Sequence, residues 1–200
     1  CAMLIAERMS EIILFDYWRS SASYRVRIVL NLKNVPYTRV PTSLLDNAQR
    51  APDYVARNPQ GFVPMLSIDG HDLTQSLAII DYLDAQHPDP AMVSSNPADR
   101  AKTLAQALII AADIHPIDNL RVLRYLKDEM GQSQEAVDQW YRHWIVEGFT
   151  ALEAMAPIMA YLAASCRIWP MSVWFRRWQM PAAWIRRWMP FRSFCGSMPR

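Results

Sequence analysis

Cysteine is scarce in this chain of 200 residues. Its three cysteines are Cys1, Cys166 and Cys195, so none lies between residues 2 and 165, and no two form a CxxC pair. This usage excludes a disulfide framework and a zinc site, and it favours a reducing compartment such as the cytoplasm.

Long apolar runs are also absent: no stretch approaches ~18 residues, so no bilayer-spanning helix is predicted. With 52% hydrophobic and 20% charged residues, the chain is not mostly disordered and has enough apolar content for a core.

Acidic residues and lysine are missing from the last part of the chain. All 19 acidic residues and 14 of the 21 basic residues lie in residues 1–156, which therefore carry 14 − 19 = −5. Residues 157–200 contain seven Arg and no Asp, Glu or Lys, which gives +7. The total of +2 is therefore the sum of a mildly acidic body and a basic tail, and we expect no nucleic-acid partner.

The tail has a composition foreign to the rest of the chain. It holds five of the eight Trp and five of the 14 Pro, with the crude repeat WFRRW and WIRRW. Three interpretations stay open: an out-of-frame product after a frameshift near residue 155, a segment that lies on a membrane surface, or a divergent helical ending. At the other end, Met9 is the expected start, and residues 1–8 are interpreted as upstream sequence or a scar.

The first part of the body has the pattern of a strand–helix–strand unit. An apolar run over residues 12–15 predicts a buried strand, and Ser20 and Ser21 stand where a following helix would be capped. Residues 36–40 predict a second strand. Residues 47–57 form a weaker helical pattern, and Asn58 to Gly61 is a turn signal.

A hairpin and a helix complete this part, which we expect over residues 9–86. Residues 65–68 and 71–73 predict two strands joined at Asp69-Gly70, and a helix opens at Thr74 or Gln75. A proline-containing linker is expected over 87–96, followed by a helical domain over 97–156. There we expect one long helix over 98–127, bent near His115-Pro116, and a second helix from Ser133. The predicted fold class is α/β plus all-α.

Three motifs carry a resemblance to a known family. SSASYRVRI, NPQGFVP and LTQSLAIIDYL resemble zeta-class glutathione transferases over residues 11–155, and DIHPIDNLRVL at 113–123 is typical of the same class. The resemblance implies a thioredoxin-like domain that binds glutathione, a helical second domain and a homodimer. It also implies glutathione-dependent cis–trans isomerisation of maleylacetoacetate to fumarylacetoacetate in tyrosine and phenylalanine breakdown, by thiolate addition, bond rotation and elimination.

The resemblance also implies which residues act. Ser20 would be the partner of the glutathione thiolate, with Ser21 beside it. The other implied glutathione-binding residues are Gln49, Val63, Pro64, Gln75, Ser76, His115, Asn119 and Arg121, with the Val63-Pro64 peptide cis. Arg19 and Arg121 are the candidates for the carboxylates of a small anionic diketo acid, and Arg25 is a weaker one. No metal is expected.

Elementary chemistry supports the same positions. A helix that opens at Gln75-Ser76 offers a hydroxyl, an amide and free N–H groups to a carboxylate. Ser20 and Ser21 begin a helix, where hydroxyl and N–H donors can stabilise a thiolate.

Structural alternatives stay open for each. The serines can be plain N-caps, Gln75-Ser76 a plain helix start, His115 a satisfied residue at a helix bend, and Asn119 a local cap.

Functional alternatives stay open as well. A maleylpyruvate isomerase or a general glutathione transferase would use the same site. A non-catalytic glutathione-binding or dimerising product is the alternative of another class, since residues 157–200 lack the Ser/Thr-x-x-Asp capping box of the family.

Overall fold

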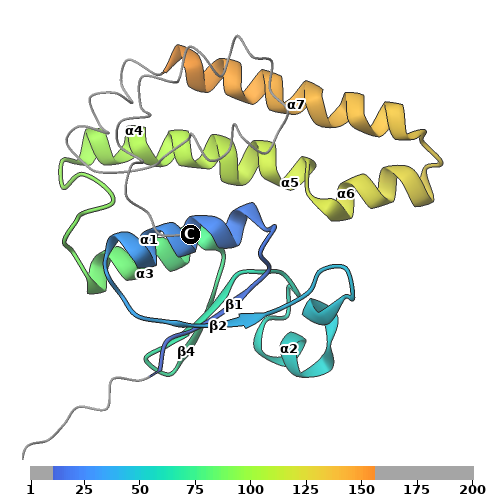
Figure 1. The fold of residues 1–200 in the computed structure, drawn as a ribbon. Coiled ribbons are helices and arrows are strands. Elements are labelled where there is room, and N and C mark those ends of the chain that lie inside the picture. The colour runs from blue at the N-terminus through green and yellow to red at the C-terminus, as the bar shows by residue number, and fades with distance from the viewer. Residues whose placement is uncertain (1–10, 156–200) are drawn as a thin grey trace, which may run out of the picture. The chain divides into compact units, whose positions relative to one another are not determined.

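The computed structural model describes residues 11–155, all within one compact unit of the chain (Figure 1). The expectations for residues 1–8 and for the tail 157–200 lie outside these residues. The sheet region contains β1 (Ile13–Asp16), α1 (Ser21–Leu32), β2 (Thr38–Pro41), η1 (Ala48–Arg50), α2 (Pro52–Arg57), β3 (Met65–Ile68), β4 (His71–Thr74) and α3 (Ser76–Gln86). The helical region contains α4 (Pro97–Leu108), η2 (Ile109–Ile114), α5 (His115–Ile117), α6 (Leu120–Arg124), η3 (Tyr125–Glu129) and α7 (Gln134–Ala154). Of the segments labelled η, η1 is a 3₁₀ helix, whereas η2 and η3 are π-helical.

The four strands form one mixed sheet in the order β2-β1-β3-β4. β1 and β2 are parallel, as the strand–helix–strand pattern predicts, whereas β3 is antiparallel to both β1 and β4. Leu14 of β1 faces Leu66 of β3 in the register, and both are fully buried. Figure 1 shows α1 and α3 between the sheet and the helices α4–α7. The expected fold class, a thioredoxin-like α/β region followed by helices, is confirmed.

A small hydrophobic cluster packs α2 against the sheet. Tyr54, Val63 and Met65 are buried together, and the Tyr54 hydroxyl donates to the Phe62 carbonyl at 2.6 Å. The expected helix over 47–57 is instead two short pieces, η1 and α2, separated by extended Ala51. The physical reason is Pro52, because the residue before a proline is disfavoured in the helical region.

The expected single helix over 98–127 was wrong. Pro116 lies in α5, which continues the π-helical turns before it without interruption. The chain breaks three residues later, at Asn119, which is extended and caps α6 by accepting from the Arg121 N–H. The second long helix is confirmed as α7, capped by Ser133. No helix among residues 11–155 is long and apolar enough to cross a membrane.

A buried lysine fastens the segment between the two regions. The Lys33 ammonium, whose side chain is 0% exposed, donates to Asp84 Oδ1 at 2.7 Å and to the carbonyls of His87 and Pro90. The same Asp84 oxygen accepts from the Met92 N–H at 2.7 Å. All three ammonium protons therefore have acceptors, and the residues after α3 are held against the end of α1.

Gly148 of α7 lets the π-helical segment approach closely, since a Cβ built there would overlap the side chain of Ile114. We expect Gly148→Ala to lower the free energy of unfolding by about 1–2 kcal/mol in urea titrations. Overpacking costs about 1–3 kcal/mol, which exceeds the gain of about 1 kcal/mol in helix propensity. Thr150→Ala, at an exposed position of the same helix, should not destabilise. Equal stability of Gly148→Ala and the parent would contradict this packing.

Candidate active site

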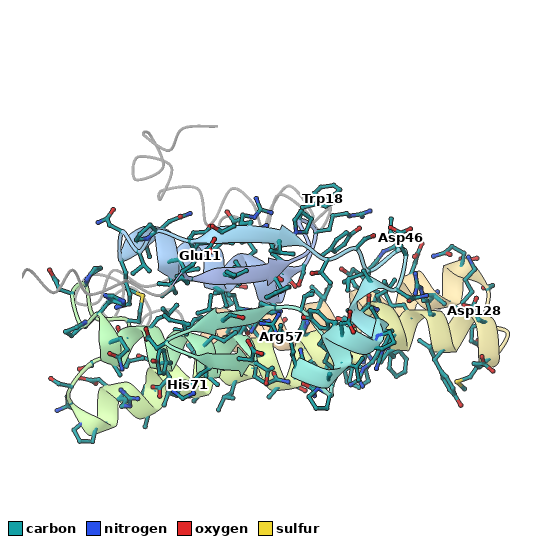
Figure 2. All side chains as sticks on the ribbon, turned by 90° about the horizontal axis from the view of Figure 1, so that it is seen from below. Glu11, Trp18, Asp46, Arg57, His71 and Asp128 are labelled. Carbon is teal, nitrogen blue, oxygen red and sulfur yellow. The ribbon has the colours of Figure 1, made fainter. Side chains whose placement is uncertain are left out.

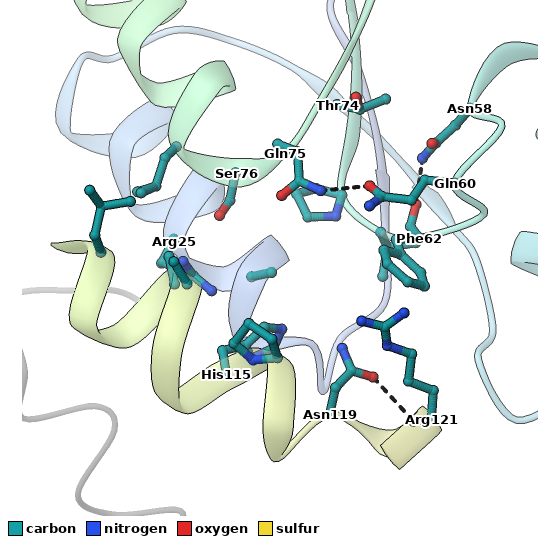
Figure 3. A pocket seen from close by; sticks show the side chains of 18 residues that line it. Arg25, Asn58, Gln60, Phe62, Thr74, Gln75, Ser76, His115, Asn119 and Arg121 are labelled. Carbon is teal, nitrogen blue, oxygen red and sulfur yellow. Dashed lines mark hydrogen bonds between the residues drawn. The ribbon is translucent and has the colours of Figure 1, made fainter. Parts of the chain in front are cut away.

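A cavity of about 330 Å³ lies where α1, the loop before β3, the start of α3 and the helical region meet (Figure 3). Its size is in the range of small-molecule sites. No carboxylate belongs to its lining, whereas two arginines do, so it favours an anion. The charged and polar lining residues are Arg25, Asn58, Gln60, Thr74, Gln75, Ser76, His115, Asn119 and Arg121.

Ser20 caps α1 at one edge of this site. Its Oγ accepts from the Ser23 N–H at 3.2 Å, and its carbonyl accepts from Tyr24 at 2.9 Å. Because the hydroxyl oxygen acts as acceptor, the hydroxyl proton remains available for an anion. Ser20 and Ser21 are not among the residues that line the cavity, but Ala22 of the same first turn is.

Ser21 contacts the helical region directly. Its Oγ lies 3.3 Å from His115 Nδ1, although the two residues are 94 positions apart. Burial lowers the pKa of His115 to about 4, and the charges of Arg25 and Arg121 lower it further. The imidazole is therefore neutral near pH 7, and a neutral imidazole carries one donor and one acceptor nitrogen. With Nδ1 as acceptor, the Ser21 hydroxyl donates to it.

The start of α3 forms another wall. Gln75, with φ 66°, precedes the first helical turn, and its Nε2 donates to Gln60 Oε1 at 2.6 Å. Ser76 is buried at 6% exposure and begins an eleven-residue helix. The Val63-Pro64 peptide beside them is cis, as the family resemblance implies. Helix N–H groups, a hydroxyl and an amide thus converge on the cavity.

The helical region contributes the opposite wall. Figure 3 shows His115, Asn119 and Arg121 on one stretch of ribbon, facing Gln75 and Ser76. The Arg121 guanidinium lies 5.1 Å from the centre of the Phe62 ring, and Arg50 lies 5.8 Å from the same ring. Asn119 also makes the local cap that its alternative interpretation describes.

Besides Ser20 and Ser21, two more expected site residues lie outside the cavity lining. Gln49 is in η1, and its buried Oε1 has no hydrogen-bond partner within residues 11–155. Its carbonyl would lie 3.0 Å from a Cβ at Gly61, so the tight loop before Phe62 needs glycine there, with φ 61°. Arg19 is exposed, with its guanidinium 5.6 Å from the centre of the Trp18 ring.

Sequence reasoning gave too little weight to Arg25 and missed Asn58 and Gln60. Arg25 is 3% exposed and lines the cavity, and burial lowers its pKa to about 10. Its spacing of four residues from Ser21 puts both on one face of α1, a signal that was available in the motif. Asn58 Nδ2 donates to the Phe62 carbonyl at 2.8 Å and so shapes the loop before β3.

Known proteins share both this fold and these motifs. The model of the glutathione S-transferase N-terminal domain matches residues 10–85. Maleylacetoacetate isomerase from Rhizobium meliloti (strain 1021) is 48% identical over 146 residues, which are 73% of this chain and 68% of that protein. A holo structure of a bacterial zeta-class maleylpyruvate isomerase aligns with TM-score 0.81 and 34% identity, over 93% of this chain and 92% of the other.

A further structure contains glutathione. Maleylacetoacetate isomerase from Methylobacterium extorquens AM1, with bound malonate and glutathione, aligns with TM-score 0.67 and 37% identity, over 72% of this chain and 67% of the other. The chain belongs to the glutathione transferase family, and within it to the zeta class. Among its relatives are proteins named maleylacetoacetate isomerase and maleylpyruvate isomerase.

Proposed function

We propose that this protein is a glutathione-dependent cis–trans isomerase that converts maleylacetoacetate to fumarylacetoacetate. The observation that carries the proposal is a single cavity bordered by the first turns of α1 and α3 and by Arg121 of the helical region, with no carboxylate in its lining. The chain that forms this cavity is 48% identical to a maleylacetoacetate isomerase over 146 residues. Maleylpyruvate is the second candidate substrate, favoured by the alignment over 93% of this chain with the maleylpyruvate isomerase structure.

The donor set fits glutathione, which has two carboxylates, an amine and a thiol. We propose that Gln75 and Ser76 hold the γ-glutamyl end, that the backbone of Val63 before Pro64 pairs with the cysteinyl residue, and that Gln49 reaches the glycyl end. His115, Asn119 and Arg121 approach from the helical region. When bound, glutathione supplies a thiol that adds reversibly to the cis double bond, so that rotation can occur before elimination.

The protein's part is to hold a thiolate and an anionic substrate. The Ser20 hydroxyl, with its oxygen already bonded to the Ser23 N–H, can donate its proton to the thiolate. The N-terminus of α1 adds a favourable dipole. Arg121, and Arg19 at the exposed turn before α1, are the proposed partners of the substrate carboxylates.

The direct test measures isomerisation of maleylacetoacetate and maleylpyruvate by the purified chain, with and without glutathione, alongside glutathione binding by calorimetry. We expect turnover that requires glutathione. Binding without turnover of either substrate would favour the non-catalytic alternative, and no binding would exclude the proposed site.

Ser20→Ala is expected to lower kcat about 100-fold, a typical loss when one donor to a developing anion is removed. The variant also loses a helix cap worth about 1 kcal/mol. Ser133→Ala is the matched control, because Ser133 caps α7 by the same bond to the third following N–H. The control should lose similar stability and keep its activity. Equal activity losses in the two variants would remove Ser20 from the mechanism.

We also propose a homodimer in the cytoplasm. The family resemblance implies the homodimer, and the scarcity of cysteine suits a reducing compartment. Sedimentation analysis of the purified chain tests the dimer.

A further inference from the structure

The turn between β1 and α1 carries Ser20 to its position. β1 ends at Asp16, and the Ser20 N–H donates to the Tyr17 carbonyl at 2.8 Å, which closes a four-residue turn. Trp18, at the tip of this turn, is 69% exposed and points outward (Figure 2). On its helical side Ser20 is held by its bonds with the Ser23 and Tyr24 N–H groups, so the turn sets the direction from which the chain enters α1.

A buried carboxylate lies directly before the turn. Asp16 is 0% exposed, and its Oδ2 accepts from Arg27 Nη1 at 2.7 Å and from Arg39 Nε at 2.9 Å. Arg27 belongs to α1 and Arg39 to β2, so three consecutive elements meet at one oxygen atom. A buried carboxylate is tolerated only with such partners.

Arg27 makes a hydrogen bond to the turn that Arg39 does not. Its second nitrogen, Nη2, donates to the Trp18 carbonyl at 3.3 Å, so one guanidinium joins the buried carboxylate to the backbone of the turn. Within residues 11–155, the side-chain hydrogen bonds of Arg39 reach Asp16 and not the turn. Both arginines therefore bind the Asp16 carboxylate, but of the two it is Arg27 that also bonds to the backbone of the turn.

We propose that Arg27, anchored by Asp16, is a positioning residue that fixes the turn of residues 17–20 and thereby the Ser20 hydroxyl at the start of α1. The guanidinium reaches these two acceptors with two different nitrogens held in one plane, whereas a lysine would have to bring its single nitrogen within bonding distance of both. The catalytic consequence rests on the proposed function, but the effect on the turn does not.

Hydrogen exchange of the ligand-free protein tests the effect on the turn. In Arg27→Gln we expect amides of residues 17–23 to exchange about tenfold faster, from loss of a hydrogen bond to a charged group. Arg39→Gln, the matched control, loses an Asp16 partner but should leave these amides unchanged. Arg27→Lys keeps the charge beside Asp16 and should still loosen the turn. Amides of α7 report any global loss of stability in the same samples.

The second measurement follows the ultraviolet absorbance of bound glutathione thiolate against pH. Arg27→Gln should raise the apparent pKa of the thiol, and Arg39→Gln should not. The proposal is overturned if both variants accelerate exchange in the turn equally, if α7 accelerates as much as the turn, or if no variant affects the turn. A parent protein that lacks isomerase activity but shows the selective exchange effect would refute the proposed function and support this role of Arg27.

Discussion

Replacing Lys33 by methionine is expected to lower the free energy of unfolding by about 3–5 kcal/mol, the usual cost of removing one partner from a buried ion pair. The Lys33 ammonium is fully enclosed, and its three protons go to Asp84 and to two backbone carbonyls. Methionine preserves most of the volume but removes the donor that all three acceptors share, and the Asp84 carboxylate then keeps its bond from the Met92 N–H without a cation. Urea titration measured by circular dichroism would give the loss directly.

Lys102→Met is the matched control. Lys102 also pairs with an aspartate, Asp99, but at 3.5 Å and with its side chain 54% exposed. Exposed pairs of this kind contribute about 0–1 kcal/mol. A combined Lys33→Met and Asp84→Leu variant should recover part of the loss, because neither charge is then buried alone. Similar losses for Lys33→Met and Lys102→Met would contradict the buried anchor.

Asp118→Asn is expected to expose a steep loss of stability in acid that the parent protein lacks. Burial raises the pKa of Asp118 to about 7, and neither of its buried carboxyl oxygens has a hydrogen-bond partner within residues 11–155. The pKa of His115 is lowered to about 4 in the folded state. These two groups act on stability in opposite directions between about pH 4 and pH 6.5.

The signs follow from proton counting. In that window the unfolded chain carries a proton on His115 that the folded protein lacks, so this group makes stability rise with pH. The folded protein holds a proton on Asp118 that the unfolded chain lacks, so this group makes stability fall with pH. Each slope is at most about 1.4 kcal/mol per pH unit, and the two cancel.

Single variants separate the two contributions. Asp118→Asn should become less stable as the pH falls from 6.5 to 4, whereas His115→Gln should become less stable as the pH rises from 4 to 7. The double variant should again have a flat profile over this range. Urea midpoints at half-unit pH steps would measure all three. Parallel profiles for the two single variants would contradict the opposed shifts.

Local signals predicted the elements of the sheet region well. Ser20 stands before a run of helical periodicity, and it caps α1. Asp69-Gly70 follows a short apolar run, and it joins β3 to β4. The prediction failed in the helical region at Pro116, where a proline was expected to bend one helix. The position of the break depends on the π-helical turns before it, which have no strong sequence signature, and on the cap at Asn119, which was one of the interpretations left open.

The candidate site could be predicted only in part. Helix starts and the cis-proline loop are local features, so Gln75, Ser76 and Pro64 could be found from motifs. The contact between Ser21 and His115 joins residues 94 positions apart, and it depends on how α5 packs against α1. Burial of Arg25 and Asp118, which changes their pKa values, likewise depends on tertiary packing.

The strand order β2-β1-β3-β4 leaves two short strands at the margins of the sheet. Each has four residues; β2 carries Arg39 and ends at Pro41, while β4 carries His71 and Asp72. Charges, a proline and short length all discourage an incoming chain from adding another strand. Association between copies should therefore use helix faces rather than a continuous intermolecular sheet. The same features of the edge strands disfavour the addition of further strands in a fibril.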